Sequence, residues 1–153
     1  MGTGYICKCP ECGYTLEAFL GVGMMYPITM REEIKKLKKG RYGEQGMRFF
    51  KEHPNGSITC ENVVTRCTAC GNLEVKYDFD LLAPRSEAID ENQNEPITNM
   101  HFDYEVEKYH HFCKKCGNKA EIVEDFEKKL EQGEMICPKC EGKLFLSDYL
   151  RWD

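Results

Sequence analysis

The chain lacks several features that would assign it to common classes of protein. It has no apolar run long enough to span a bilayer, so a membrane role has no support. Its first residues show no basic segment followed by an apolar one, so a secretory signal is not predicted. Lysine and arginine number 21 against 26 acidic residues, a net charge of -5, which argues against attraction of nucleic acid over the whole surface. These absences favour a cytoplasmic protein.

Catalytic motifs are also missing. The four histidines occur in neither an H-E-x-x-H motif nor an H-x-E motif combined with P-C-x-x-C. A catalytic zinc ion normally keeps three protein ligands and a water, and histidines could in principle complete such a site. We interpret the histidines as surface or packing residues and do not expect an enzyme or a small-molecule substrate. They are His53, His101, His110 and His111.

Cysteine, in contrast, is abundant. Ten cysteines occur in 153 residues, 31% of which are charged, and the mean hydropathy is -0.58. Such a composition leaves a modest apolar core, so bound metal is expected to supply part of the stability. Eight cysteines form four C-x2-C pairs, the spacing of thiolate ligands in structural zinc sites. The predicted ligands are Cys9, Cys12, Cys67, Cys70, Cys113, Cys116, Cys137 and Cys140.

The distances along the chain predict how these pairs combine. Twenty residues separate Cys116 from Cys137, which suits one closed four-cysteine site. By the same argument the two upstream pairs form a second site, with 54 residues between Cys12 and Cys67. Two Zn2+ ions are therefore expected, and their eight thiolates would change the net charge from -5 to -9. The other two cysteines, Cys7 and Cys60, are extra thiols, either buried and inert or available for redox or metal handling.

The segment Cys9-Pro-Glu-Cys12-Gly-Tyr14 resembles a rubredoxin knuckle, and the four pairs together resemble the zinc-ribbon and rubredoxin-like class. The whole chain is also similar to small bacterial zinc-ribbon proteins. This resemblance implies metal binding and short antiparallel strands, and it adds no substrate. Neither cysteine set has the separation found in rubredoxin, so zinc is favoured, with iron as the alternative metal for four thiolates.

The rest of the pattern predicts an α+β protein of two zinc-ribbon-like units with short antiparallel strands. The first unit spans 1–82 and contains a helical insertion at about 29–53, the acidic stretch 83–100 is a loop or linker, and the second unit spans 101–153. Thr29 and Glu32 form a capping box that predicts a helix over 30–39. Further helices are expected over 44–52 and 124–132, and strands around 5–6, 57–66, 73–81, 102–106, 120–123 and 143–147.

Three functions remain open. The first is a protein-interaction or regulatory module, favoured by closed metal sites and acidic charge; the apolar segment 15–27 is either core or a contact surface for a partner. The second is a nucleic-acid accessory protein, because residues 31–51 carry a net charge of +5. The third is redox or metal handling through Cys7 and Cys60. The residues that could contact an anion are Lys35, Lys36, Lys38, Lys39 and Arg41.

Overall fold

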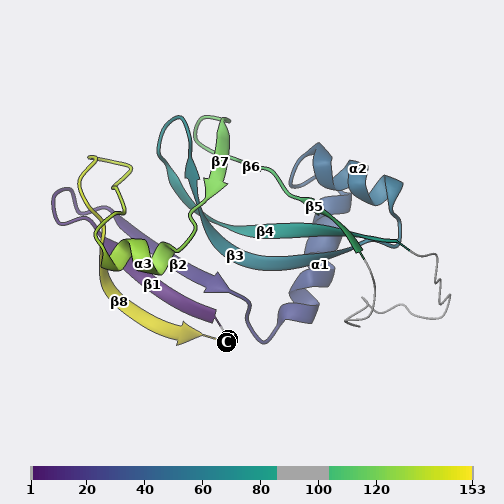
Figure 1. Cartoon of the computed structure of the whole chain (residues 1–153), viewed down its shortest axis with the longest axis horizontal. Helices are drawn as coiled ribbons and strands as arrows, with labels where there is room; N and C mark the ends of the chain where they lie inside the picture. The colour runs from purple at the N-terminus through teal and green to yellow at the C-terminus, as the bar shows by residue number, and fades with distance from the viewer. Residues whose placement is uncertain (1, 86–103, 153) are drawn as a thin grey trace. The chain divides into compact units, whose positions relative to one another are not determined.

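The computed structural model describes residues 2–85 and 104–152 (Figure 1). These residues form a small, mostly antiparallel β protein with three helices. Most of the predicted acidic stretch, together with His101 and Phe102, lies outside the described residues. The elements are β1 (Gly2–Lys8), β2 (Thr15–Gly21), α1 (Tyr26–Lys38), α2 (Glu44–Glu52), β3 (Ser57–Cys67), β4 (Leu73–Pro84), β5 (Tyr104–Lys108), β6 (His111–Phe112), β7 (Lys119–Ile122), α3 (Phe126–Glu131) and β8 (Phe145–Trp152).

Contacts divide the chain into two compact units, each made of segments that are not consecutive. Unit 1 comprises Met1–Met24, Glu61–Tyr77 and His110–Asp153, and unit 2 comprises Met25–Cys60 and Asp78–Tyr109. The boundaries differ from the predicted division at 82 and 101 because the long strands β3 and β4 each contribute residues to both units. All four cysteine pairs belong to unit 1.

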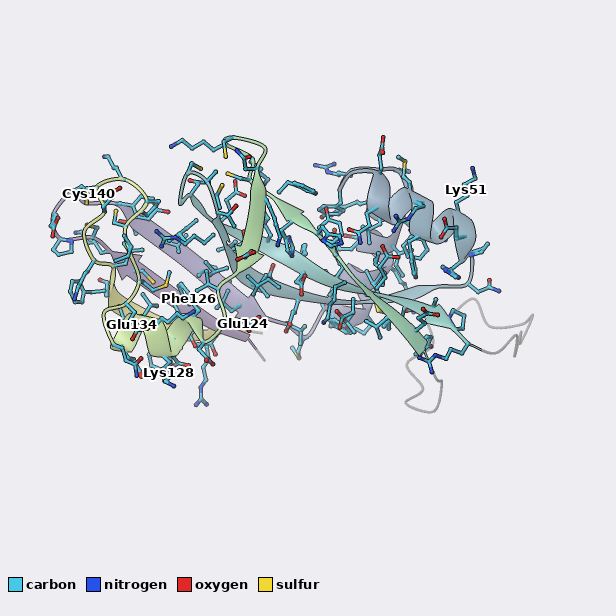
Figure 2. All side chains as sticks on the ribbon, turned by 45° about the horizontal axis from the view of Figure 1, so that its top comes forward. Lys51, Glu124, Phe126, Lys128, Glu134 and Cys140 are labelled. Carbon is cyan, nitrogen blue, oxygen red and sulfur yellow. The ribbon has the colours of Figure 1, made fainter. Side chains whose placement is uncertain are left out.

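In unit 1, β1 is the central strand between β2 and β8, and both neighbours run antiparallel to it (Figure 1). Alternate residues of β1 and β2 enter the core, including Tyr5 and Ala18, which are directly opposite each other. Helix α3 covers this face. The ring of Phe126 meets that of Tyr5 edge to face at a centroid distance of 5.8 Å, and Figure 2 shows Lys128 on the outer side of the helix. The remaining strands extend the unit through the pairs β2–β3, β3–β7 and β7–β6.

Unit 2 packs the two helices of the predicted insertion closely together. A Cβ atom added at Gly46 of α2 would lie 2.7 Å from the Leu37 side chain of α1, so only glycine allows this approach. Helix α2 has the predicted bounds, but α1 begins at Tyr26 rather than Met30. The expected capping box is wrong because proline in the first turn already starts the helix, which leaves Thr29 inside it.

The apolar segment 15–27 is buried at one end and exposed at the other. Leu16 and Ala18 are buried in the core of unit 1. At its other end, Met24 is 77% exposed and Met25 is 59% exposed. The change coincides with the end of β2, where alternation between a covered and an open face of the sheet stops.

Candidate metal centres

Each cysteine pair lies on a tight knuckle with the same backbone hydrogen bonds. In the first knuckle the Cys9 N–H donates to the Tyr14 carbonyl, and the Gly13 N–H donates to the Cys9 carbonyl, at 2.8 and 2.9 Å. The residue after the second cysteine takes a positive φ of 62 to 74° in all four knuckles. Three of these residues are glycine, which adopts positive φ readily, whereas the fourth is Glu141.

The eight cysteines that we predicted as ligands come together in two groups of four. Within each group the four Sγ atoms all lie within 4.8 Å of one another. We call Cys9, Cys12, Cys137 and Cys140 site A, and Cys67, Cys70, Cys113 and Cys116 site B. Each site therefore combines one knuckle from the N-terminal half of the chain with one from the C-terminal half.

The predicted combination of knuckles is wrong, and strand pairing explains why. The turn between β1 and β2 carries the first knuckle, and β8 pairs with β1 so that Leu146 lies opposite Cys7. This pairing brings the fourth knuckle, which precedes β8, to the first. Similarly, β7 pairs with β3 so that Ala120 lies opposite Cys67, which brings the third knuckle to the second. Separation along the chain was misleading because any two C-x2-C knuckles can form one site.

The distances between sulfurs fit a tetrahedral metal ion. The Sγ atoms of Cys9 and Cys140 are 3.5 Å apart, and those of Cys12 and Cys137 are 3.6 Å apart. In site B the corresponding pairs across the two knuckles are 3.4 and 3.7 Å apart. A tetrahedron with metal–sulfur bonds of about 2.3 Å has edges of about 3.8 Å, whereas a disulfide would bring two sulfurs to about 2.05 Å. Both groups therefore could hold a metal ion, and four thiolates suit Zn2+ or iron.

Backbone and side-chain N–H groups favour the thiolate form that a metal requires. The Cys70 N–H lies 3.4 Å from Cys67 Sγ, and the Lys139 N–H lies at the same distance from Cys137 Sγ. The side-chain amide of Asn118 and its backbone N–H lower the pKa of Cys116 to about 6. Burial opposes ionisation of Cys9, but the N–H groups of Cys12 and Glu11 outweigh it and hold the pKa at about 7.

The two sites differ in their surroundings. In site A the Glu11 carboxylate lies over Gly142, because a Cβ added there would be 2.5 Å from a carboxylate oxygen. The same oxygen lies 4.0 Å from Cys140 Sγ. In site B the third knuckle instead carries Lys114 and Lys115, both exposed. Site A thus has the more negative environment.

Cys7 and Cys60 belong to neither group. Both are buried, and burial raises the pKa of Cys7 to about 11. A thiol that is buried and protonated is a poor nucleophile, which weakens the redox hypothesis. Among the described histidines, His111 is buried and the ring of His53 packs on Phe49, and neither belongs to a cysteine group.

The predicted anion-contact residues in α1 and just after it are partly engaged within unit 2. Lys36 forms an ion pair with the buried Glu33, and this pairing raises the pKa of the lysine. Lys38 lies over the Phe50 ring at 5.1 Å from its centroid. The remaining three, Lys35, Lys39 and Arg41, are exposed.

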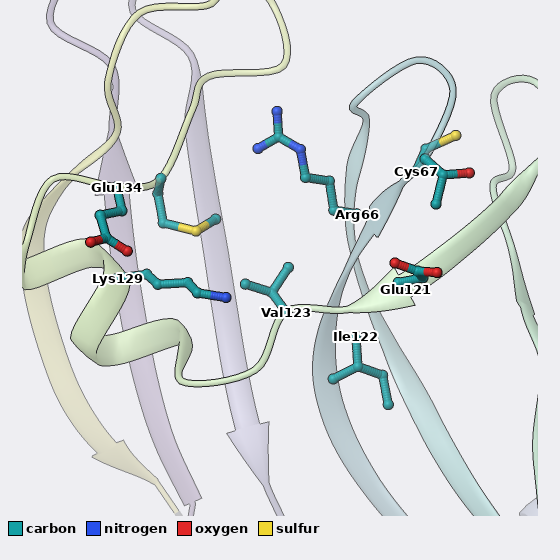
Figure 3. Close-up of a pocket in the computed structure, with 9 residues that line it drawn as sticks. Arg66, Cys67, Glu121, Ile122, Val123, Lys129 and Glu134 are labelled. Atoms are coloured by element: carbon teal, nitrogen blue, oxygen red, sulfur yellow. The ribbon is translucent and has the colours of Figure 1, made fainter.

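A cleft of about 390 Å³ in unit 1 was not predicted. Its walls carry charges of both signs, and Figure 3 shows Arg66 and Glu121 on the side of β3 and β7 and Lys129 and Glu134 around α3. The apolar residue Met135 also lines the cleft. Cys67 of site B also lines this cleft. No periodic pattern in the sequence could predict this cleft, because its residues come from elements that are distant in sequence.

The fold and the cysteine groups define a small antiparallel β protein with two candidate four-thiolate metal centres. No protein-family model matches the chain, and neither a curated protein nor a solved structure shows significant similarity to it. Within the described ranges 2–85 and 104–152, no helix has the length and apolar character needed to cross a membrane.

Proposed function

We propose that the chain is a cytoplasmic zinc protein whose two four-cysteine centres are structural and whose role is to bind another protein. The observation that carries the structural role is the assembly of each centre from two distant knuckles. A metal ion at either site would cross-link the ends of strands that lie more than forty residues apart in the chain. Zinc would supply this cross-link and thereby couple metal binding to folding.

The residues of the chain also argue for a structural rather than a catalytic metal. Four thiolates complete a tetrahedron and leave no position for a water or a substrate. The N–H groups at Cys67 and Cys137 orient the sulfurs and stabilise their charge, as expected of the groups around a structural centre. A reducing compartment such as the cytoplasm would keep all ten cysteines available as thiols.

Elemental analysis of the native protein, combined with a thiol count after denaturation without reductant, tests this proposal. We expect two zinc ions per chain, ten thiols, and loss of cooperative unfolding when a chelator removes the metal. A single ion, or a disulfide among the ten cysteines, would contradict it. Iron in place of zinc would leave the cross-linking role but overturn the assignment of the metal.

A second candidate is binding of nucleic acid by the basic segment formed by α1 and the residues that follow it to Arg41. It is supported by the exposed side chains of Lys35, Lys39 and Arg41. The test is charge reversal of these three residues, with Lys8→Glu as a control on an exposed lysine of unit 1. Binding to a single-stranded oligonucleotide should weaken steeply with salt and disappear only in the triple variant. Equal binding by both variants would exclude this basic segment as the binding site.

A further inference from the structure

Strand β8 is an open edge of the sheet of unit 1. Among the described residues it pairs with β1 alone, and it ends the strand order. Its side chains from 145 to 151 are all exposed, and four are large and apolar. Natural edge strands are usually short, charged or covered, because a long apolar edge attracts another strand. The exposed fractions are 47% for Phe145, 39% for Leu146, 55% for Tyr149 and 38% for Leu150.

The open edge also presents backbone groups. The Tyr149 N–H donates to the Asp148 carboxylate at 2.8 Å, so it is not directed at the opposite residue of β1, Tyr5. In an antiparallel pair, alternate residues direct both N–H and C=O away from the partner strand. Tyr149 and Arg151 therefore direct their backbone groups to the open edge, where an added strand would bind.

We propose that this added strand is β8 of a second copy of the chain, paired antiparallel and centred on Leu150. The two copies would form one continuous sheet with a twofold axis perpendicular to it. This interaction goes beyond the proposed function, since it names a surface and a partner that the metal centres do not require.

In an antiparallel pair, the side chains of opposite residues lie on the same face of the sheet. Because the two β8 strands are identical, residues can be opposite each other only if their numbers differ by an even amount. With Leu150 opposite itself, Tyr149 lies opposite Arg151 of the second copy, and this contact occurs twice. A guanidinium over a tyrosine ring is attractive. Centring on Tyr149 instead would place the Asp148 carboxylate opposite Leu150. The Leu150 register is therefore the better match for side chains.

The outer face of the sheet supports the same register. Leu150 lies opposite Gly4, which lies opposite Phe19 on the other side. A Cβ added at Gly4 would be 3.0 Å from the Phe19 ring and 3.2 Å from Leu150, so these two side chains close over the glycine. A second copy would double this apolar strip and bury Leu150 at its centre.

Asp148 competes with pairing, because its carboxylate accepts the N–H that the added strand would use. Asp148→Ala should therefore lower the dissociation constant of the dimer. The same contact would protect the edge of a monomer, since an acceptor on the strand itself blocks part of the edge.

Sedimentation equilibrium of the metal-loaded full chain tests the proposal. Wild type should dimerise reversibly with concentration, whereas Leu150→Lys and Leu150→Glu should each raise the dissociation constant at least about tenfold by opposing like charges. An equimolar mixture of the two variants should dimerise again through lysine opposite glutamate. Lys128→Glu, on the outer side of α3, is the control and should behave as wild type.

Two outcomes would overturn the inference. A wild-type chain that stays monomeric throughout excludes the dimer, and a monomer that still holds two zinc ions leaves the proposed function intact. A Leu150→Lys chain that dimerises more tightly than wild type would place lysine opposite Asp148 and exclude the Leu150 register. Metal content and melting of each variant show whether it is folded.

Discussion

Arg66 Nη1 donates a hydrogen bond to the carbonyl of Ile136 at 3.2 Å. Arg66 immediately precedes Cys67 of site B, and Ile136 immediately precedes Cys137 of site A. One hydrogen bond thus joins the backbone beside one centre to the side chain beside the other. The two centres are therefore expected to respond to each other, because ordering either knuckle helps to position this contact.

Arg66→Met should lower the free energy of unfolding by about 1–2 kcal/mol, because it removes a hydrogen bond with a charged donor. It should also separate the release of the two metal ions during titration with a chelator, whereas wild type should release them together. Lys129→Met, in the same cleft, is the matched control and should retain coupled release. Coupled release in Arg66→Met would show that the contact does not link the centres.

The combination of knuckles can be tested with pairs of cysteine variants. Cys12→Ser with Cys137→Ser should leave one zinc ion per chain, because both residues belong to site A. Cys12→Ser with Cys70→Ser should leave none, because each change damages a different site. The pairing of knuckles predicted from the sequence would give the opposite zinc content for each of these two double variants. Zinc content and the spectrum of cobalt-substituted protein would distinguish the two.

The sequence predicted the local elements better than their combination. Each knuckle is a short-range structure determined by two cysteines and the following residue, so Cys9 to Cys12 could be interpreted without the rest of the chain. The choice between knuckles depends instead on β8 pairing with β1 and β7 with β3. Those pairings are long-range and carry no signal in the spacing of cysteines.

Helix α1 shows a second limit of the pattern. Met30, Ile34 and Leu37 have the spacing of one apolar helix face, but the helix buries Glu33 instead of Ile34. The Glu33 carboxylate accepts hydrogen bonds from Lys36 and from the hydroxyl of Tyr42, which offset the cost of burying its charge. An acidic residue that is buried with its own partners cannot be distinguished from a surface residue by hydropathy.

Cys7 should make stability sensitive to alkaline pH. Burial raises its pKa from 9.0 to about 11, so the folded chain keeps a proton that the unfolded chain loses earlier. The stabilising effect is complete below pH 9 and declines as pH rises towards about 11. The stability advantage of wild type over Cys7→Ala should therefore shrink over this range, as measured by chemical denaturation. Val64→Ala, a buried change without a titrating group, should show a constant difference.

The backbone at Glu141 should cost stability, since it has a φ of 62° where the other knuckles have glycine. Glu141→Gly should raise the free energy of unfolding of the zinc-loaded protein by about 1 kcal/mol, because side chains disfavour left-handed backbone. Gly117→Ala is the reciprocal test: φ is 74° and no atom lies within 4 Å of the added Cβ, so backbone strain alone should destabilise it. Glu141→Ala keeps the strain and should change little. If it stabilised as much as Glu141→Gly, the cause would be the negative charge beside site A.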